Sequence, residues 1–360
     1  MCDTKTFKLV DLNCEENISK ELAIEARKQY SRLSKEAANL IKLTTCLTCG
    51  SQCDSFCNSH SIPSFVLQNI SENGKLFRMS KLLNVDPLQE TYGVNEISTF
   101  KLICRKCDSV LFQKYENEVV LKNNINNFLL NDIALKNYLK EYYNKNLYSN
   151  LPINKLQIKN SPISAQIEPW KYDSRLALKR IYKIIKANSK QDLLYYSFFE
   201  ICLDYTVPIA FQSKATLISD LNGAIINNVY KFDSNYELKD LHICIFPLKS
   251  KTKILMFVEN HDKRYSAFRK QFSKLQTDEK LKIINYILFL YSDDIYISPN
   301  VDKKIFSNPL LKEVASINAT YQYRPMQKPD QSEIIKLAAS VYNLSKAKDI
   351  PNLLSEKYKL

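Results

Sequence analysis

Four cysteines arranged as two pairs carry the clearest chemistry in the sequence. Each pair has the spacing Cys-x-x-Cys, and the pairs are Cys46 with Cys49 and Cys104 with Cys107. A tight turn can place both thiolates of such a pair on one side, so two pairs offer four soft ligands to one tetrahedral zinc ion. The spacing therefore predicts a structural Zn²⁺ site with these four cysteines as its ligands.

Two polar residues beside the cysteines have catalytic potential. His60 is followed by Ser-Ile-Pro, and Asp108 comes directly after the last cysteine. An imidazole takes up a proton near neutral pH, and a carboxylate oxygen binds Mg²⁺ or Mn²⁺ well. Structural alternatives remain, because His60 can donate to a backbone carbonyl or bind zinc, and Asp108 can cap a helix. Cys53 and Cys57 are core or loop cysteines, or form a second metal site with His60.

Together these motifs resemble the HNH (ββα-metal) endonuclease family in a zinc-stabilised form. The similarity covers residues 44–118 and rests on Cys-x-x-Cys-Gly, on His-x-Ile-Pro and on the second Cys-x-x-Cys followed by a polar residue. In that family a histidine acts as general base on a metal-polarised water. The resemblance therefore implies that His60 is the base and that Asp108 helps to hold a catalytic Mg²⁺ or Mn²⁺ ion. It also implies a treble-clef layout and action on DNA, in many members as bacterial defence against foreign DNA.

The catalytic positions depart from the family pattern. Ser59 stands where the family usually has Asp, and Thr99 stands where a middle Asn is expected, with Asn95 nearby. A hydroxyl is a poorer metal ligand than a carboxylate. Glu116 is a second candidate carboxylate, because it follows Asp108 by about two helical turns. Two hypotheses result: a divalent-metal-dependent DNA endonuclease, or a non-catalytic zinc module that binds nucleic acid or a protein partner.

The composition indicates a globular protein with a strongly basic charge. The chain has 360 residues, 45% of them hydrophobic, and a formal net charge of +13, which suits two or three domains with a sizeable core. Nucleic acid is the obvious polyanionic partner, although a general bias toward lysine and asparagine also accounts for the charge. Only four glycines are present, and the sequence shows no P-loop, nucleophile elbow or dinucleotide-binding pattern.

The sequence also predicts where the protein resides. No apolar run is long enough to span a bilayer, and no apolar leader follows the first methionine. A cytoplasmic location with reduced cysteines, and no membrane partner, is therefore expected. A protein partner or a homo-oligomer stays open.

Hydrophobic periodicity predicts an α+β fold in which a small zinc-knuckle, HNH-like module precedes a larger domain with an antiparallel sheet and packed helices. The predicted division is an N-terminal helical arm (1–43), the zinc-binding module (44–118), a connecting helix (119–150), a linker (151–170) and a C-terminal α+β domain (171–360). The predicted helices cover 18–43, 64–70, 108–118, 119–148, 174–187, 190–204, 281–291 and 332–344. The predicted strands cover 76–83, 99–104, 207–213, 217–219, 225–232, 238–248 and 253–259.

Two groups of charged residues in the predicted C-terminal domain each have a structural and a functional interpretation. The helix at 174–187 is densely basic, and either a solvated face or phosphate contacts explain this. His261 and Asp262 with Arg264 form either a small catalytic group or a charged loop between a strand and a helix, and the loop is the favoured interpretation.

Overall fold

The computed structural model describes residues 20–79, 91–123, 125–152, 167–190, 192–231, 235–292, 294–317 and 331–360, and the structural statements here concern those residues. It confirms the α+β class. Within the described ranges, ten helices surround a seven-stranded sheet in which every neighbouring pair of strands is antiparallel. The strand order is β3-β2-β9-β6-β7-β8-β5.

The strands of this sheet come from both halves of the chain. They are β2 (Lys75–Met79), β3 (Thr91–Gly93), β5 (Tyr196–Leu203), β6 (Ile209–Ala215), β7 (Leu241–Pro247), β8 (Thr252–Glu259) and β9 (Ile295–Ile297). A separate two-stranded ladder pairs β1 (Ser59–His60) with β4 (Thr99–Phe100). In the large sheet, Phe77 of β2 lies opposite Ile297 of β9. The segment predicted as the zinc module therefore contributes a hairpin to the same sheet as the predicted C-terminal domain.

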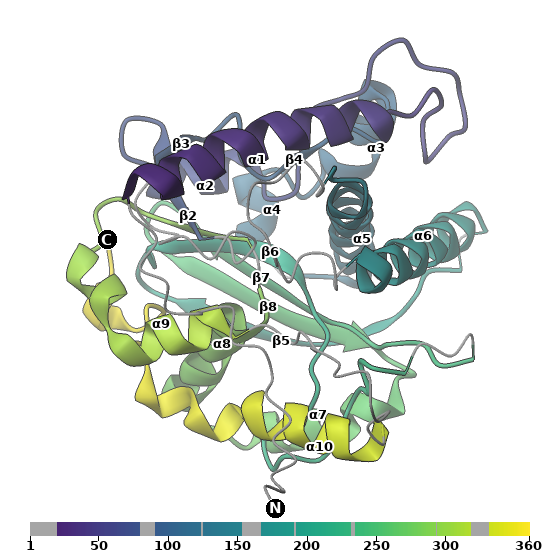
Figure 1. Ribbon diagram of the computed structural model, residues 1–360. Coiled ribbons are helices and arrows are strands. Elements are labelled where there is room, and N and C mark those ends of the chain that lie inside the picture. The colour runs from purple at the N-terminus through teal and green to yellow at the C-terminus, as the bar shows by residue number, and fades with distance from the viewer. Residues whose placement is uncertain are drawn as a thin grey trace, which may run out of the picture.

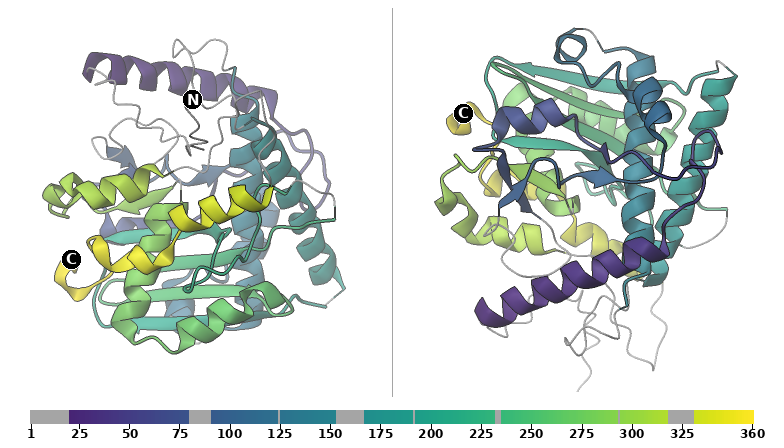
Figure 2. Two further views of the ribbon diagram at one scale, coloured as in Figure 1. Left: turned by 60° about the horizontal axis from the view of Figure 1, so that its bottom comes forward. Right: turned by 90° about the horizontal axis from the view of Figure 1, so that it is seen from above.

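Helices cover both faces of the sheet (Figures 1 and 2). On one face lie α1 (Lys20–Leu40), α2 (Ser64–Ile70), α3 (Arg105–Phe112), α4 (Glu118–Lys122), α5 (Asn127–Ser149) and α6 (Ile167–Ser189). On the other lie α7 (Ser266–Ser273), α8 (Thr277–Tyr291), α9 (Pro309–Ser316) and α10 (Gln331–Val341). This arrangement buries both faces of the central strands, whereas alternate residues of the edge strand β5 stay exposed.

The central strands are buried throughout because both of their faces contact helices. Along β7, Ile243 and Ile245 belong to the core under α7 to α10, whereas Cys244 and Phe246 belong to the core shared with α5, α6 and the cysteine region. Alternate side chains of a strand point to opposite faces. A strand covered on both faces is therefore mostly apolar, as β7 and β8 are, and their polar exceptions His242, Thr252 and Lys253 are buried.

Several predicted elements are wrong. The helix predicted at 190–204 is the strand β5, at the edge of the sheet. Its residues alternate between the two faces, and its many aromatic and β-branched side chains suit a pleated surface. Residues 225–231, the described part of the strand predicted at 225–232, contain turns instead, and the helix predicted at 119–148 is two helices, α4 and α5. Most of the predicted linker lies outside the described residues.

Candidate metal centre

The two cysteine pairs meet in space. The sulfur atoms of Cys46, Cys49, Cys104 and Cys107 all lie within 4.8 Å of one another. Zinc–sulfur bonds of about 2.3 Å in a tetrahedron place neighbouring sulfurs about 3.8 Å apart, so small adjustments close the group around one ion. The group is therefore suited to a structural Zn²⁺ ion, and among the described residues it is the one such group of cysteine, histidine or acidic side chains.

A tight turn forms the first half of the site. Gly50 has φ of +71°, and its N–H donates to the carbonyl oxygen of Cys46 at 2.8 Å. This positive φ is favourable for glycine, which lacks a Cβ atom. Thr45 and Gln52 form a bridge across the turn. The turn directs the sulfurs of Cys46 and Cys49 to one side.

The start of α3 forms the second half. Cys104 is the N-cap residue, and its sulfur accepts a hydrogen bond from the Cys107 N–H at 3.4 Å. The Cys104 N–H donates to the sulfur of Cys46 at 3.3 Å, and the Leu47 N–H donates to the carbonyl oxygen of Leu102 at 3.0 Å. The last two of these bonds join segments that are more than fifty residues apart in the sequence. They hold the two turns together independently of any metal–ligand bond.

Hydrogen bonds favour thiolate at two of the four positions, and at Cys49 they come from the side chain and backbone of Ser51 and lower the pKa. Burial opposes ionisation of Cys46, but hydrogen bonds from backbone groups and the Thr48 hydroxyl outweigh it and lower its pKa to about 6. Cys107 has the opposite shift, because burial and the neighbouring sulfurs of Cys104, Cys49 and Cys46 raise its pKa. A divalent cation reverses such a shift, since it deprotonates a coordinating thiol outright.

His60 occupies the short strand β1, opposite Thr99 of β4. Its Nε2 atom is 3.3 Å from the carbonyl oxygen of Val94, so this nitrogen is the donor and Nδ1 is the unprotonated acceptor. Burial lowers the pKa of His60, and the bond to Val94 only partly offsets this effect. The half-buried ring is therefore a neutral imidazole with one basic nitrogen.

Asp108 lies inside the first turn of α3, so it does not cap the helix; Cys104 does. One carboxylate oxygen of Asp108 accepts from the Cys57 thiol at 3.4 Å, and the other is buried with no hydrogen-bond partner among the described residues. The hydroxyl of Ser59 is buried in the same way. Because neighbouring residues of a strand point to opposite faces, Ser59 and His60 face different surroundings.

The residues near Asp108 do not fit a catalytic Mg²⁺ or Mn²⁺ ion. Such ions need several oxygen ligands, of which one or two are carboxylates. Here one carboxylate is bonded to a soft thiol, and His60 has a different set of neighbours. Glu116, the second candidate carboxylate, forms an ion pair with the buried Lys136. It also lies beyond α3, which ends at Phe112, so the predicted helical alignment of Asp108 with Glu116 is wrong. Catalytic roles for His60 and Asp108 stay predictions.

The other predicted groups have structural partners. Cys53 donates to the carbonyl oxygen of Ser51, so the alternative site with Cys57 and His60 does not assemble. Asp262 caps a short 3₁₀ helix, and Arg264 donates to Asn227 and to the carbonyl oxygen of Glu237, which fits the charged-loop interpretation.

The basic helix α6 is largely neutralised by acidic residues. Lys179 and Arg180 form ion pairs with Glu237, and Arg180 and Lys183 form ion pairs with Glu259. Lys171 pairs with Glu168 within the helix. This arrangement supports the structural interpretation of that charge and leaves fewer free cations for phosphate.

Sequence reasoning missed a set of buried charges between α5 and the sheet. Lys136 and Lys140 lie on one side of α5, and Asp294 pairs with both Arg78 and Lys140. Burial lowers the pKa of Lys140 to about 8, although Asp294 opposes the shift. The available signal was the spacing of the two lysines, four residues apart in a helix segment rich in Leu, Ile and Ala.

Two further results bear on the class of protein. In the described part of the chain, no helix combines the length and apolarity that a membrane span requires. Comparison with family models, curated proteins and solved structures finds no match to this chain.

Proposed function

We propose that residues 44–118 form a zinc-stabilised, HNH-like module of treble-clef type that binds nucleic acid without cleaving it. Support comes from the four-cysteine group and from the cations of the second turn. Lys101, Arg105 and Lys106 are exposed and form no ion pair with a described residue. They precede or open α3, whose first turn also carries the zinc ligand Cys107. Zinc binding thus fixes the backbone that presents three positive charges.

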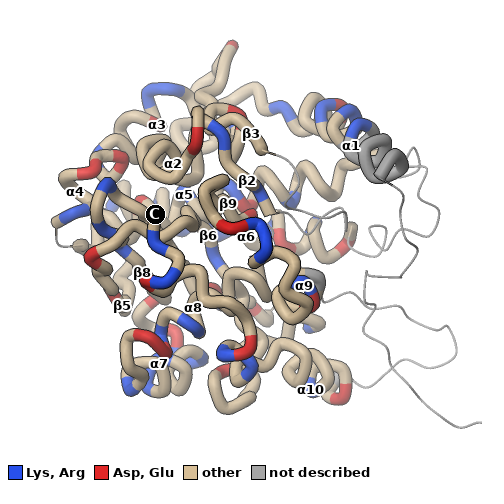
Figure 3. The backbone as a smooth tube through the Cα atoms, turned by 90° about the vertical axis from the view of Figure 1, so that its left-hand side faces the viewer, with Lys and Arg blue, Asp and Glu red and all other residues tan. Residues whose placement is uncertain are grey.

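The contrast with α6 carries the proposal. A Lys or Arg side chain that already pairs with a carboxylate gains little free energy from binding a phosphate, because the phosphate must first displace that carboxylate. The three cations around α3 have no such competitor among the described residues. Along the rest of the backbone seen in Figure 3, Lys and Arg alternate with Asp and Glu, although α1 also carries several Lys and Arg. We therefore place the phosphate contacts at the zinc turn rather than on α6.

Metal analysis tests the zinc part of the proposal. The expected result is one zinc per chain in the wild type and none in a Cys46→Ser, Cys104→Ser double variant. A wild-type protein that contains no zinc after purification in zinc-supplemented medium contradicts this part.

Fluorescence anisotropy across a salt series tests the nucleic-acid part. The variant Lys101→Ala, Arg105→Ala, Lys106→Ala should bind a labelled DNA duplex more weakly, and the slope of log Kd against log salt should fall by about 2 to 3. The matched control replaces Lys263, Lys270 and Lys274, which are exposed near α7 on the opposite side of the sheet. Equal slopes for the two triple variants contradict the assigned surface.

Hydrolysis of DNA is the second candidate, and one observation favours it. His60 and Thr99 face each other across two antiparallel strands, at the spacing where the HNH pattern expects its base and its Asn. The bond to Val94 leaves Nδ1 of His60 free to accept a proton. Plasmid nicking with Mg²⁺ or Mn²⁺, comparing wild type with His60→Ala, decides the matter. Cleavage that depends on His60 supports the enzyme, whereas equal cleavage or none removes it.

A further inference from the structure

The two edges of the large sheet differ in length and in protection. β3, at one edge, has three residues, whereas β5, at the other edge, has eight. An edge strand offers a row of unpaired N–H and C=O groups to another strand, and proteins limit this with short strands, bulges, proline or charged side chains. β5 contains no proline and pairs with β8 residue by residue from Tyr196 to Leu203, without a bulge. It is therefore a long edge strand with little of the usual protection.

The hydrogen-bond pattern shows which main-chain groups of β5 face outward. The Asn260 N–H donates to the carbonyl oxygen of Tyr195 at 2.8 Å, and this pair continues the register of β5 with β8. In an antiparallel ladder, alternate residues direct both main-chain groups to the same neighbouring strand. The odd-numbered residues of β5 therefore bond to β8, and Phe198, Glu200 and Cys202 direct their N–H and C=O groups away from it.

A side chain of α5 occupies this outer edge only at its start. Asn127 donates through its amide nitrogen to the carbonyl oxygen of Leu194 at 2.7 Å, and its amide oxygen accepts from the Tyr196 N–H at 3.0 Å. These two bonds replace those of a neighbouring strand at this point. Farther along β5, the outward main-chain groups of residues 198, 200 and 202 form no hydrogen bond with another described residue.

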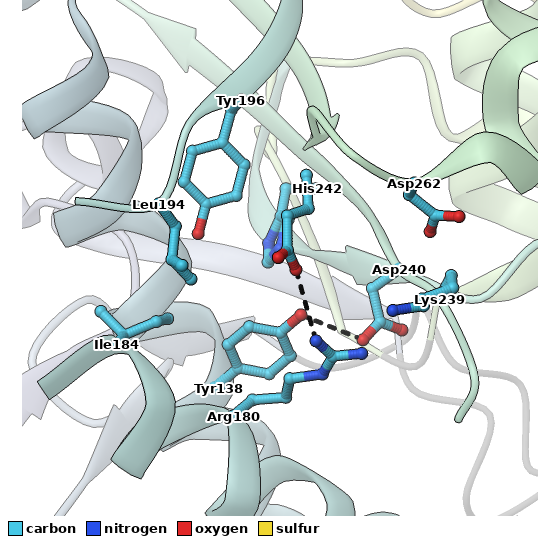
Figure 4. Close-up of a pocket in the computed structure, with 10 residues that line it drawn as sticks. Tyr138, Arg180, Ile184, Leu194, Tyr196, Lys239, Asp240, His242 and Asp262 are labelled. Carbon is cyan, nitrogen blue, oxygen red and sulfur yellow. Dashed lines mark hydrogen bonds and ion pairs between the residues drawn. The ribbon is translucent and has the colours of Figure 1, made fainter. Parts of the chain in front are cut away.

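Helices also cover the side chains of β5 only at its start (Figure 4). Tyr196 lines a pocket together with Tyr138 of α5 and Ile184 of α6. The next three side chains on the same face of the strand are exposed, and one of them is the aromatic ring of Phe198, at 42%. The open stretch therefore offers a partner strand both hydrogen bonds and apolar surface to bury.

The charge of the strand does not oppose pairing with an identical strand. Glu200 is the one charged residue of β5, and its carboxylate lies 2.6 Å from Nζ of Lys253 on β8. Lys253 is 3% exposed, so the ion pair is internal to one chain. Like charges on opposing strands destabilise a sheet, but here each copy neutralises its own carboxylate.

We propose that β5 pairs antiparallel with β5 of a second copy of this chain, so that two seven-stranded sheets join into one. A two-fold axis perpendicular to the sheet turns the same donors and acceptors of each copy toward the other, so an identical strand is complementary to this edge. The stretch from Phe198 to Cys202 supplies the hydrogen bonds. The side chain of Asn127 ends the pairing at Tyr196.

Proline at position 198 tests this pairing in the full chain. The Phe198 N–H points away from β8, so Phe198→Pro removes an outward donor and keeps the bonds between β5 and β8. Sedimentation velocity over a concentration series should show a dimer for the wild type. The Kd for dimerisation should rise about tenfold or more in Phe198→Pro, because one hydrogen bond is lost per copy.

Two further variants separate the main chain from the side chain. Phe198→Ala is the matched control, because it removes the same ring but keeps the N–H donor, so its Kd should rise less than that of Phe198→Pro. Phe198→Lys keeps the main chain and adds a charge to each copy, so it should also weaken the dimer. Circular dichroism checks the fold of each variant, and Phe198→Lys decides the test if the proline variant is unfolded.

Three results overturn the proposal. A wild-type chain that stays monomeric at its highest soluble concentration shows that the edge does not pair. A dimer with the same Kd in the wild type, Phe198→Pro and Phe198→Lys forms through another surface. An equal rise of the Kd in Phe198→Ala and Phe198→Pro shows that the dimer depends on the ring and not on strand pairing.

Discussion

Around the four cysteines regular structure is sparse, whereas β7 and β8 are long strands buried on both faces. The ladder in the cysteine region consists of two residues on each side, Ser59–His60 and Thr99–Phe100. β7 and β8 instead have seven and eight residues, almost all of them buried. A short ladder cannot compensate for the entropy of ordering its loops, but a metal–ligand set can. We infer that zinc adds to hydrophobic burial in the first region, where Leu102, Ile103 and Phe112 are buried, and is not required in the second.

Removal of one zinc ligand should produce the largest effect and only in the cysteine region. Structural zinc contributes about 10 kcal/mol or more in small modules, which rivals the whole stability of a domain. Cys104→Ser should therefore abolish zinc binding and the hydrogen-exchange protection of residues 44–70 and 97–112. Cys202→Ser is the control, because Cys202 is exposed on β5. If Cys104→Ser keeps both its zinc and the hydrogen-exchange protection of these residues, the cysteine region does not depend on zinc as inferred.

Truncation in the sheet should destabilise the protein without loss of zinc. Ile243 is fully buried on the face opposite the cysteines. Ile243→Ala should lower the free energy of unfolding by about 2–5 kcal/mol, because it leaves a cavity, while zinc content stays at one per chain. Ile225→Ala, at a position 44% exposed, should cost far less. Denaturant titration with a zinc assay checks both, and zinc loss in Ile243→Ala would show that the two regions depend on each other.

The sheet region should also weaken in acid at a defined pH. Burial lowers the pKa of His242 to about 4, although Asp240 opposes the shift. In the unfolded chain this pKa returns to about 6.5, so the unfolded chain binds more protons between these values. Stability should therefore fall as pH drops from about 6.5 to about 4, by up to about 3 kcal/mol. His242→Gln should reduce this slope in denaturant titrations at stepwise pH, and an unchanged slope assigns the acid sensitivity to other groups.

The smallest effect is expected on α6. The Lys183 side chain is 42% exposed, and its partner Glu259 keeps a second cation in Arg180. An exposed ion pair contributes at most about 1 kcal/mol, so Lys183→Ala should shift thermal melting only slightly. A loss as large as that of Ile243→Ala would show that α6 is held by charge rather than by its apolar side.

Local sequence patterns predicted the cysteine site. They did not predict its surroundings, because those depend on residues that are distant in the sequence. Each Cys-x-x-Cys spacing is a short-range feature of the sequence, and the two spacings are nearly sufficient to identify the four cysteines of the site. Helical periodicity gives no sign that Lys136 is buried, but it is, because Glu116 and the rings of Phe112 and Tyr115 surround its ammonium group. Such partners lie on other helices and loops, so the hydrophobic periodicity of one helix cannot predict them. The three-residue strand β9 was missed for the same reason, since pairing on both sides defines it.

The place of β9 in the sheet bears on how the protein is made. This strand is inserted between β2 and β6 and pairs with both. During synthesis the chain emerges from its N-terminus, so the hairpin of β2 and β3 leaves the ribosome some two hundred residues before its neighbour Ile295–Ile297. That hairpin therefore waits, with one edge unpaired, until β9 has been synthesised. A nascent chain stalled before residue 295 should expose it to protease or to chaperones.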